Sequence, residues 1–290
     1  MIDAHHHLWD LNAVNYPWLM EKGKRRFFGD PTPIQRNYLI DEHIKLANEL
    51  GFKGSVHIQV GAADGLEEAQ WINSVVNENQ SWPMVQVAFC DLSSDQRELH
   101  LDKLQKLSSV VGVRQIIGRS PAEDANSKTN ELLTSDNFMQ GLQSISDRGL
   151  TFDLQIIPEL LKTCASVFSQ FPNLQVILCH AGSPYNRTLE GIKSWAGDLI
   201  HLSNLSNVSC KLSGLGMFDH NWTGSTVAPI VTTVMDQFGS KRVMFGSNFP
   251  VDSLSSSFEQ LFTRISSNID EKDFEDVFSK TAQRIYFSNF

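Results

Sequence analysis

The sequence lacks several features that mark whole classes of protein. Its 290 residues include four cysteines with no CxxC spacing, so neither a zinc knuckle nor a thioredoxin-like redox pair is indicated. No apolar run approaches the roughly 20 residues that cross a bilayer. No basic segment followed by an apolar one opens the chain, so we expect a cytoplasmic protein without a leader. A GxGxxG turn after an early strand is also missing, which argues against dinucleotide binding.

Positive charge is scarce as well. The chain has 24 lysines and arginines against 33 acidic residues, a net charge of -9. Nucleic acid and anionic membrane surfaces require a concentrated positive field, so we expect neither partner. We expect a small-molecule substrate and a monomer or small homo-oligomer. The hydrophobic fraction of 41% is typical of a globular chain, and the length suits one barrel domain spanning residues 1–290.

Short apolar runs rich in β-branched residues alternate with longer amphipathic stretches along the chain. This rhythm is typical of strand–helix units on a parallel sheet. The strands are expected near residues 2–8, 53–60, 84–89, 110–117, 150–155, 174–180, 206–212 and 242–247. The helices are expected at 41–50, 67–76, 96–107, 130–148, 158–171, 189–202, 227–238 and 258–265. Eight units favour a (β/α)8 TIM barrel over an open doubly wound sheet, which also alternates strands and helices.

Polar residues follow the predicted strands, where barrel enzymes place their active sites. They are His5, His7, His57, Gln59, Arg114, Asp153, Gln155, His180, Lys211 and Asn248. Residues i and i+2 of a strand share a face, so His5 and His7 can share a cation or a substrate. A histidine-rich terminus can also be an expression tag. The apolar neighbours Ile2, Leu8 and Trp9 favour a buried strand instead.

An ordered set of motifs resembles the amidohydrolase superfamily. The similarity is to its amidohydrolase-related (amidohydrolase 2) branch, which contains sugar-lactone and 2-pyrone-4,6-dicarboxylate lactonases. The motifs are DAHHHLW at 3–9, YPWL at 16–19, GVR at 112–114, HAGSP at 180–184, CKLSGL at 210–215 and FGSNFPV at 245–251. The resemblance implies a metal-dependent-hydrolase-like barrel that contains the whole chain.

The resemblance also implies that His5, His7 and His180 surround the reacting carbonyl and bind a divalent metal, zinc or manganese. Imidazole suits zinc, and an open coordination position allows Lewis-acid hydrolysis. A binuclear centre would need a carboxylated lysine or a glutamate on a middle strand and a histidine on the fifth, which reads TFDLQ at 151–155. We therefore expect at most one metal. The branch also contains metal-free members, and His180 can alternatively cap a strand by hydrogen bonding.

Asn248 is a departure from the family pattern, which has an aspartate at the end of the eighth strand. Asparagine cannot act as a general base. Three interpretations remain: another group has taken the role, Asn248 only orients water, or hydrolytic activity is lost. Asp252 is the nearest carboxylate in sequence, and a turn can fold it toward the mouth or leave it solvated. His180 is the other candidate base, because a neutral imidazole accepts a proton at physiological pH.

Further polar and aromatic residues are candidates for substrate binding. Arg114 presents a planar fork suited to a carboxylate or an oxyanion, and Lys211 can act similarly. The alternative for each is a salt bridge between loops. His57 can line the pocket floor or belong to a hydrogen-bonded interior pair, and Trp18 can form an apolar wall or pack beneath its loop. Strand alternation should turn Cys179 and Cys210 toward the helices.

The sequence therefore predicts a hydrolase that opens a small lactone by water attack at the carbonyl. The substrate would derive from a sugar acid or a carboxylated ring. Amide hydrolysis or decarboxylation on the same barrel is an alternative, and so is a degenerate, non-catalytic binding barrel. A glycoside hydrolase is disfavoured, because that chemistry needs two carboxylates and Asp153 is the one plausible strand-end candidate.

Overall fold

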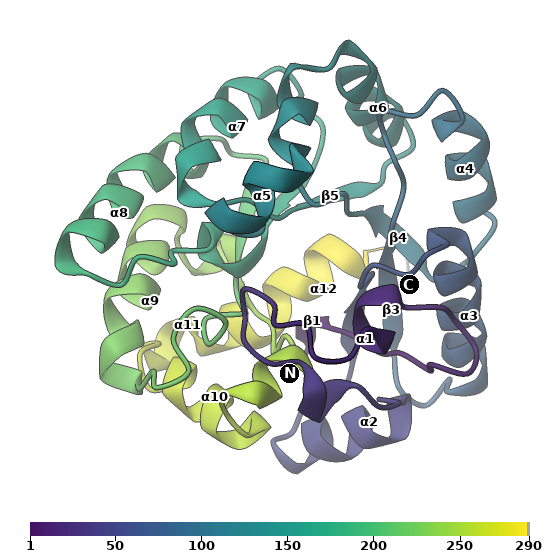
Figure 1. Cartoon of the computed structure of the whole chain (residues 1–290). Coiled ribbons are helices and arrows are strands. Elements are labelled where there is room, and N and C mark those ends of the chain that lie inside the picture. Colours follow the sequence, from purple (N-terminus) through teal and green to yellow (C-terminus); the bar gives the residue numbers. More distant parts are fainter. Residues whose placement is uncertain (289–290) are drawn as a thin grey trace.

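Eight short strands form one parallel sheet. The computed structural model describes residues 1–288, and in it the strands are neighbours in sequence order from β1 to β8 (Figure 1). The strands are β1 Asp3–His6, β2 Ser55–Ile58, β3 Met84–Ala88, β4 Val110–Val113, β5 Thr151–Leu154, β6 Val176–Leu178, β7 Val208–Leu212 and β8 Val243–Phe245. Each lies inside a range that the sequence predicts. The eight strands and the TIM-barrel class are therefore confirmed.

The barrel closes where the segment after β8 meets β1. The backbone N–H of Asn248 donates to the carbonyl of His5, and the N–H of His7 donates to the carbonyl of Phe249, both at 2.7 Å. At the same seam, the Asp3 carboxylate accepts from the Ser247 backbone at 2.8 Å and from its hydroxyl at 2.5 Å. The seam therefore brings His5 and His7, at the carboxyl end of β1, next to Asn248, which follows β8.

Helices surround the strands (Figure 1). They are α1 Pro17–Met20, α2 Ile40–Glu49, α3 Gly65–Glu78, α4 Arg97–Leu104, α5 Pro121–Ser127, α6 Asp136–Asp147, α7 Leu161–Phe168, α8 Leu189–Ser203, α9 Gly224–Phe238, α10 Phe258–Ser266, α11 Glu271–Glu275 and α12 Thr281–Tyr286. All eight predicted helices are present. The expected helix at 130–148 is divided, because Ser135 caps α6 by accepting from the Phe138 N–H at 3.3 Å.

Two apolar layers hold the barrel together. The larger fills the space between the strands and the helices. The smaller lies inside the barrel and includes Val56, Val87, Ile177 and Met244. Helix α12 contributes Ala282, Ile285 and Tyr286 to this inner layer and crosses the centre of the ring in the view of Figure 1. Across residues 1–288, we find no helix with the length and apolar character that crossing a membrane requires.

Candidate functional site

A cavity of about 280 Å³ opens at the carboxyl ends of the strands. Five polar residues of its lining follow five different strands: His7, Arg114, Gln155, His180 and Asn248. Its apolar lining comes from the loops and consists of Pro17, Trp18, Phe27, Phe28, Val60, Ile116, Met217 and Val251. The volume is close to the lower limit of about 300 Å³ for ligand pockets. The cavity therefore suits a molecule of one small ring.

His7 presents one ring nitrogen to the cavity in a defined form. Its Nδ1 lies 2.7 Å from the Ile58 carbonyl, which can only accept, so Nδ1 carries the proton. Burial, with the nearby Arg114 charge, holds the pKa of His7 well below its usual value. The neutral ring therefore has its lone pair on Nε2. That nitrogen faces the Asn248 Oδ1, another acceptor, at 3.2 Å.

His5 and His180 complete a group of three imidazoles. The His5 ring centroid lies 5.1 Å from that of His7 and 4.7 Å from that of His180. Burial lowers the pKa of both His5 and His180 well below the usual value. Both nitrogens of His5 are buried without a hydrogen-bond partner. The structure therefore brings the three predicted histidines together, with His7 and His180 on the cavity wall and His5 behind them.

The backbone around His180 explains how its ring reaches the cavity. His180 has a φ of 56°, in the left-handed region that non-glycine residues rarely adopt. The Ser213 hydroxyl lies 2.9 Å from Nδ1 and holds the ring. The same Ser213 hydroxyl accepts from the His180 backbone N–H at 3.4 Å. A strained backbone at a cavity wall is typical of functional sites.

The donor atoms around these rings suit a divalent metal ion. Two acceptors that face one another, His7 Nε2 and Asn248 Oδ1, are unfavourable unless a cation or a proton lies between them. The unpartnered nitrogens of His5 supply further ligands of the type that zinc prefers. The donor types present therefore fit one metal ion, but among the described residues the ligand atoms of His5, His7 and His180 do not all lie within 4.8 Å of one another.

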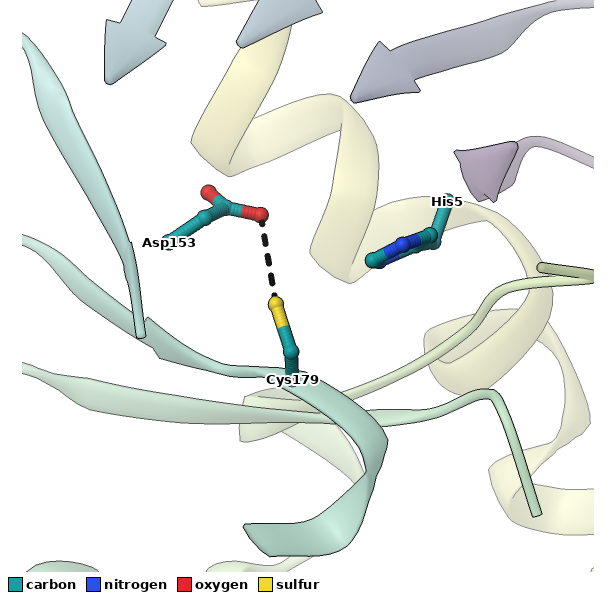
Figure 2. A group of neighbouring side chains, drawn as sticks. All are labelled: His5, Asp153 and Cys179. Carbon is teal, nitrogen blue, oxygen red and sulfur yellow. Dashed lines mark hydrogen bonds between the residues drawn. The ribbon is translucent and has the colours of Figure 1, made fainter. Parts of the chain in front are cut away.

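A second set of possible ligands meets at His5 (Figure 2). Among the described residues, the ligand atoms of His5, Asp153 and Cys179 lie within 4.8 Å of one another. Asp153 is already engaged, because its Oδ2 accepts from the Lys211 ammonium at 2.5 Å and its Oδ1 from the Tyr286 hydroxyl at 2.8 Å. A dication at Asp153 would therefore meet the charge of Lys211. The one closely spaced ligand set among the described residues is therefore already engaged in an ion pair, and a metal held by His5, His7 and His180 stays a prediction.

Cys179 corrects one expectation from the sequence. Its Sγ points into the barrel and lies 3.8 Å from Asp153 Oδ2 (Figure 2). In β6, Ile177 belongs to the inner layer and Leu178 to the outer one, so alternation turns Cys179 inward. His180 reaches the same side through its positive φ. Burial raises the pKa of the Cys179 thiol to about 12, so it is a neutral thiol. Cys210 packs in the outer layer, as expected.

Arg114 lies on the cavity wall without a carboxylate partner. Its guanidinium donates to the Gln59 carbonyl and, at 3.0 Å, to the Gln155 Oε1. It forms no salt bridge within residues 1–288. The guanidinium is therefore held in place while its charge stays available to a ligand.

Two more arginines line the cavity and were missed by the sequence analysis. Arg119 lies in the loop after β4, and Arg26 pairs with Glu123 at 3.3 Å. Both are in long loops where no periodic pattern places a side chain. Only the position of Arg119, five residues beyond Arg114, offered a signal.

Lys211 and His57 are the predicted binding residues that the structure does not bring to the cavity. Lys211 is fully buried in its ion pair with Asp153 and lies 4.9 Å from the Tyr286 ring centroid. Lys211 therefore forms a salt bridge, as the alternative interpretation of the sequence expected, but the salt bridge lies inside the barrel and not between loops. His57 lies between Val56 and Ile58, which face inward, so it points outward toward Glu68, 3.7 Å away.

Asn248 and Trp18 both line the cavity, which for Trp18 is the first of the two positions left open by the sequence. Trp18 lines the cavity and donates to the Val60 carbonyl at 2.7 Å, while Trp9 packs beneath it with ring centroids 5.8 Å apart. The Asn248 Nδ2 donates to Asp252 Oδ1 at 2.9 Å. Asp252 is folded back and buried, and burial raises its pKa to about 7. Its side chain does not line the cavity.

Comparisons with known proteins agree with this architecture. The chain is 31% identical to the uncharacterized protein y4mH of Sinorhizobium fredii, over 99% of this chain and 98% of that protein. It is 22% identical to an L-fucono-1,5-lactonase of Burkholderia multivorans, over 98% and 95% of the two chains. An amidohydrolase from Burkholderia multivorans, crystallised with bound Zn, has the same fold, with a TM-score of 0.84 at 22% identity over 99% and 98%. The sequence model of the family described as Amidohydrolase matches residues 2–287. The chain belongs to the amidohydrolase family.

Proposed function

We propose that this protein opens a small lactone by attack of water on the ring carbonyl. The observation that carries the proposal is the convergence of two neutral imidazoles, His7 and His180, and the Asn248 amide oxygen on one cavity, beside the guanidinium of Arg114 and with His5 behind the wall. Water attack needs a polarised carbonyl, a positioned water and a group that takes a proton. The similarity to L-fucono-1,5-lactonase supports a lactone as the substrate.

The cavity lining supports an acidic or hydroxylated ring as the substrate class. Arg114 is held by Gln59 and Gln155, so its remaining donors can meet a carboxylate or a developing oxyanion without reorganisation. Trp18 offers an apolar face to a sugar or pyrone ring. Arg26 and Arg119 add positive charge to the same wall. We therefore favour lactones of sugar acids or carboxylated rings.

His5, His7 and His180 would hold one zinc or manganese ion, which when bound polarises a carbonyl and lowers the pKa of water. The bound Zn in the amidohydrolase structure of the same fold supports this choice. A metal-free route, in which the histidines and Arg114 polarise the carbonyl directly, is the alternative.

His180 is the residue to which we assign proton transfer. Asn248 cannot accept the proton, and the Asp252 side chain lies outside the cavity. When His180 donates through Nδ1 to the Ser213 hydroxyl at 2.9 Å, its Nε2 carries the lone pair. That nitrogen can either accept a proton or bind a metal, but not both at once. Activity that survives removal of metal by a chelator would indicate that His180 accepts a proton, whereas activity that is lost would indicate that it binds the metal.

The test is lactone hydrolysis followed by proton release, with protein prepared once with a chelator and once with added zinc or manganese. The panel contains sugar-acid lactones, a carboxylated pyrone, the matching amides and aromatic carboxylic acids. Lactone turnover that needs metal supports a mononuclear hydrolase, and turnover without metal supports the metal-free route. Turnover confined to amides or carboxylic acids contradicts the lactone assignment. Ligand retention without any turnover indicates a non-catalytic barrel.

A further inference from the structure

We propose that Asp252 is a positioning residue that locks the Asn248 side-chain amide with its oxygen toward His7 and the cavity. The kinetic part of this inference rests on the proposed lactone hydrolysis, whereas its geometric part does not. The two oxygens of a carboxylate are equivalent, whereas an asparagine side chain can place either its oxygen or its nitrogen toward a given neighbour. The hydrogen-bond partners of the amide determine which of the two orientations it adopts.

The backbone first fixes where the Asn248 side chain starts. Asn248 has a φ of 54°, and its N–H donates to the His5 carbonyl at 2.7 Å. Its own carbonyl accepts from the Asp252 N–H at 3.1 Å. Asparagine tolerates this left-handed conformation better than most residues. The turn thus brings the two side chains at positions 248 and 252 together.

Left to His7 alone, the amide would choose the other orientation. The Nδ1–H of His7 is committed to the Ile58 carbonyl at 2.7 Å, so Nε2 is an acceptor. A flipped amide would donate its Nδ2–H to that nitrogen. The structure shows instead the oxygen facing Nε2 at 3.2 Å. Some stronger contact on the far side of the amide must oppose the flip.

Asp252 supplies that contact. Its Oδ1 accepts from Asn248 Nδ2 at 2.9 Å. Burial raises the pKa of Asp252 to about 7, so above that pH the acceptor is a carboxylate, and a bond to a carboxylate is about twice as strong as a neutral one. Asp252 is 2% exposed, and the surrounding residues leave its side chain no room to turn toward solvent. Because it does not line the cavity, it acts through Asn248 and not on the substrate.

The proposal predicts that full activity requires one amide and one carboxylate at positions 248 and 252, whichever of the two positions carries the amide. In D252N, the amide at position 252 can donate or accept, so Asn248 is free to flip and bond to His7 Nε2. We expect kcat to fall by about 10- to 100-fold, as for other residues that orient a metal or catalytic ligand. In the exchanged variant N248D/D252N, the new amide at 252 can hold the new carboxylate at 248. Its kcat should return to within about tenfold of wild type.

The test measures kcat and, in chelator-treated protein, the imidazole ¹⁵N resonance of His7 Nε2, which is assigned with H7Q. In D252N, this resonance should move upfield as Nε2 becomes a hydrogen-bond acceptor. The exchanged variant is judged by kcat alone, because a carboxylate at position 248 would itself draw a proton to Nε2. D91N is the matched control, because Asp91 accepts a 2.9 Å bond from the Gln115 amide away from the cavity. The control should leave both readouts unchanged.

An unchanged His7 resonance in folded D252N would overturn the proposal. So would an exchanged variant no more active than D252N. If D252N does not fold, as judged by its thermal transition, the exchanged variant decides by whether its kcat lies within about tenfold of wild type. If no lactone is turned over even by wild type, the proposed reaction fails, and the resonance still tests the role of Asp252.

Discussion

At the residue scale, burial sets the chemistry of the site. Water is removed from around His5, His7 and His180, and this keeps all three imidazoles neutral with pKa values well below normal. Neutral imidazoles offer lone pairs to a cation or a proton. Arg114 lies on the cavity wall without a carboxylate partner, and Gln59 and Gln155 hold its guanidinium.

Arg114→Lys should lower kcat/KM by about 10- to 100-fold. Lysine keeps the charge but loses the fork, and a hydrogen bond to a charged group is worth about 1.5–3 kcal/mol. Steady-state hydrolysis of a carboxylated lactone measures the effect. The control is Arg36→Lys, because Arg36 makes a two-pronged pair with Glu42 at 2.7 and 2.6 Å on the exposed surface. An equal loss in both variants would contradict a role for Arg114 in binding.

His43 should make the fold sensitive to acid. It stacks on His6 with ring centroids 3.8 Å apart and lies near Asp3, His57 and Tyr38. Burial lowers the pKa of His43 to about 3, below its unfolded value of about 6.5. Its stabilising contribution is therefore present above pH 6.5 and is lost as the pH falls from 6.5 toward 3.

The comparison of wild type with His43→Phe isolates this contribution. Burial raises the pKa of Asp3 to about 6, and this acts in the opposite direction, so wild type alone would be ambiguous. Between about pH 6 and 4, the free energy of unfolding should fall more steeply in wild type, by about 1.4 kcal/mol per pH unit. Urea unfolding at several pH values measures the slope. Parallel slopes would show that His43 is already protonated in the folded protein.

At the element scale, the seam between β1 and β8 holds the site together, and Gly246 permits it. A Cβ at Gly246 would lie 2.5 Å from the Cβ and 3.0 Å from the backbone N of His5. No larger residue allows the two segments to approach this closely. The seam also carries the hydrogen bonds of Asn248 and His7, so packing at Gly246 and the geometry of the site are linked.

Gly246→Ala should destabilise the protein by about 1–3 kcal/mol, the usual cost of overpacking. It should also reduce activity, because β1 moves with His5. Chemical denaturation measures the first effect. Gly197→Ala in α8 is the matched control: nothing lies within 4 Å of the added Cβ, so stability should rise by up to about 1 kcal/mol. Equal stability of Gly246→Ala and wild type would contradict the account of the seam.

The elements also show what the sequence could predict. The eight strands were predictable, because β-branched runs and turn residues mark each one. The short helices α5, α11 and α12 were not, because a helix of two turns or fewer carries too little periodicity. For His57 and Cys179, the strands were right and the faces were wrong. Neighbouring residues of a strand point to opposite faces, so an error of one residue in the expected alternation reverses the face of each side chain. Only the packing of the folded chain decides which face each residue takes.

At the scale of the whole molecule, one chain end builds the site and the other closes the barrel behind it. The first strand supplies His5 and His7, while Tyr286 of α12 donates to Asp153 at 2.8 Å beneath them. The loops that carry Arg26 and Arg119 complete the cavity from above. Those loop residues could not be predicted, because their positions depend on contacts between segments far apart in the sequence.

The central claim is that the histidines of the first strand perform lactone hydrolysis at this cavity. The most direct test compares kcat/KM for a sugar-acid or carboxylated lactone in wild type, in H5A/H7A and in H201A, which removes an exposed histidine of α8. We predict that H201A keeps wild-type activity and that the folded double variant loses about 10³-fold or more. Full lactone hydrolysis by H5A/H7A would contradict the site described above.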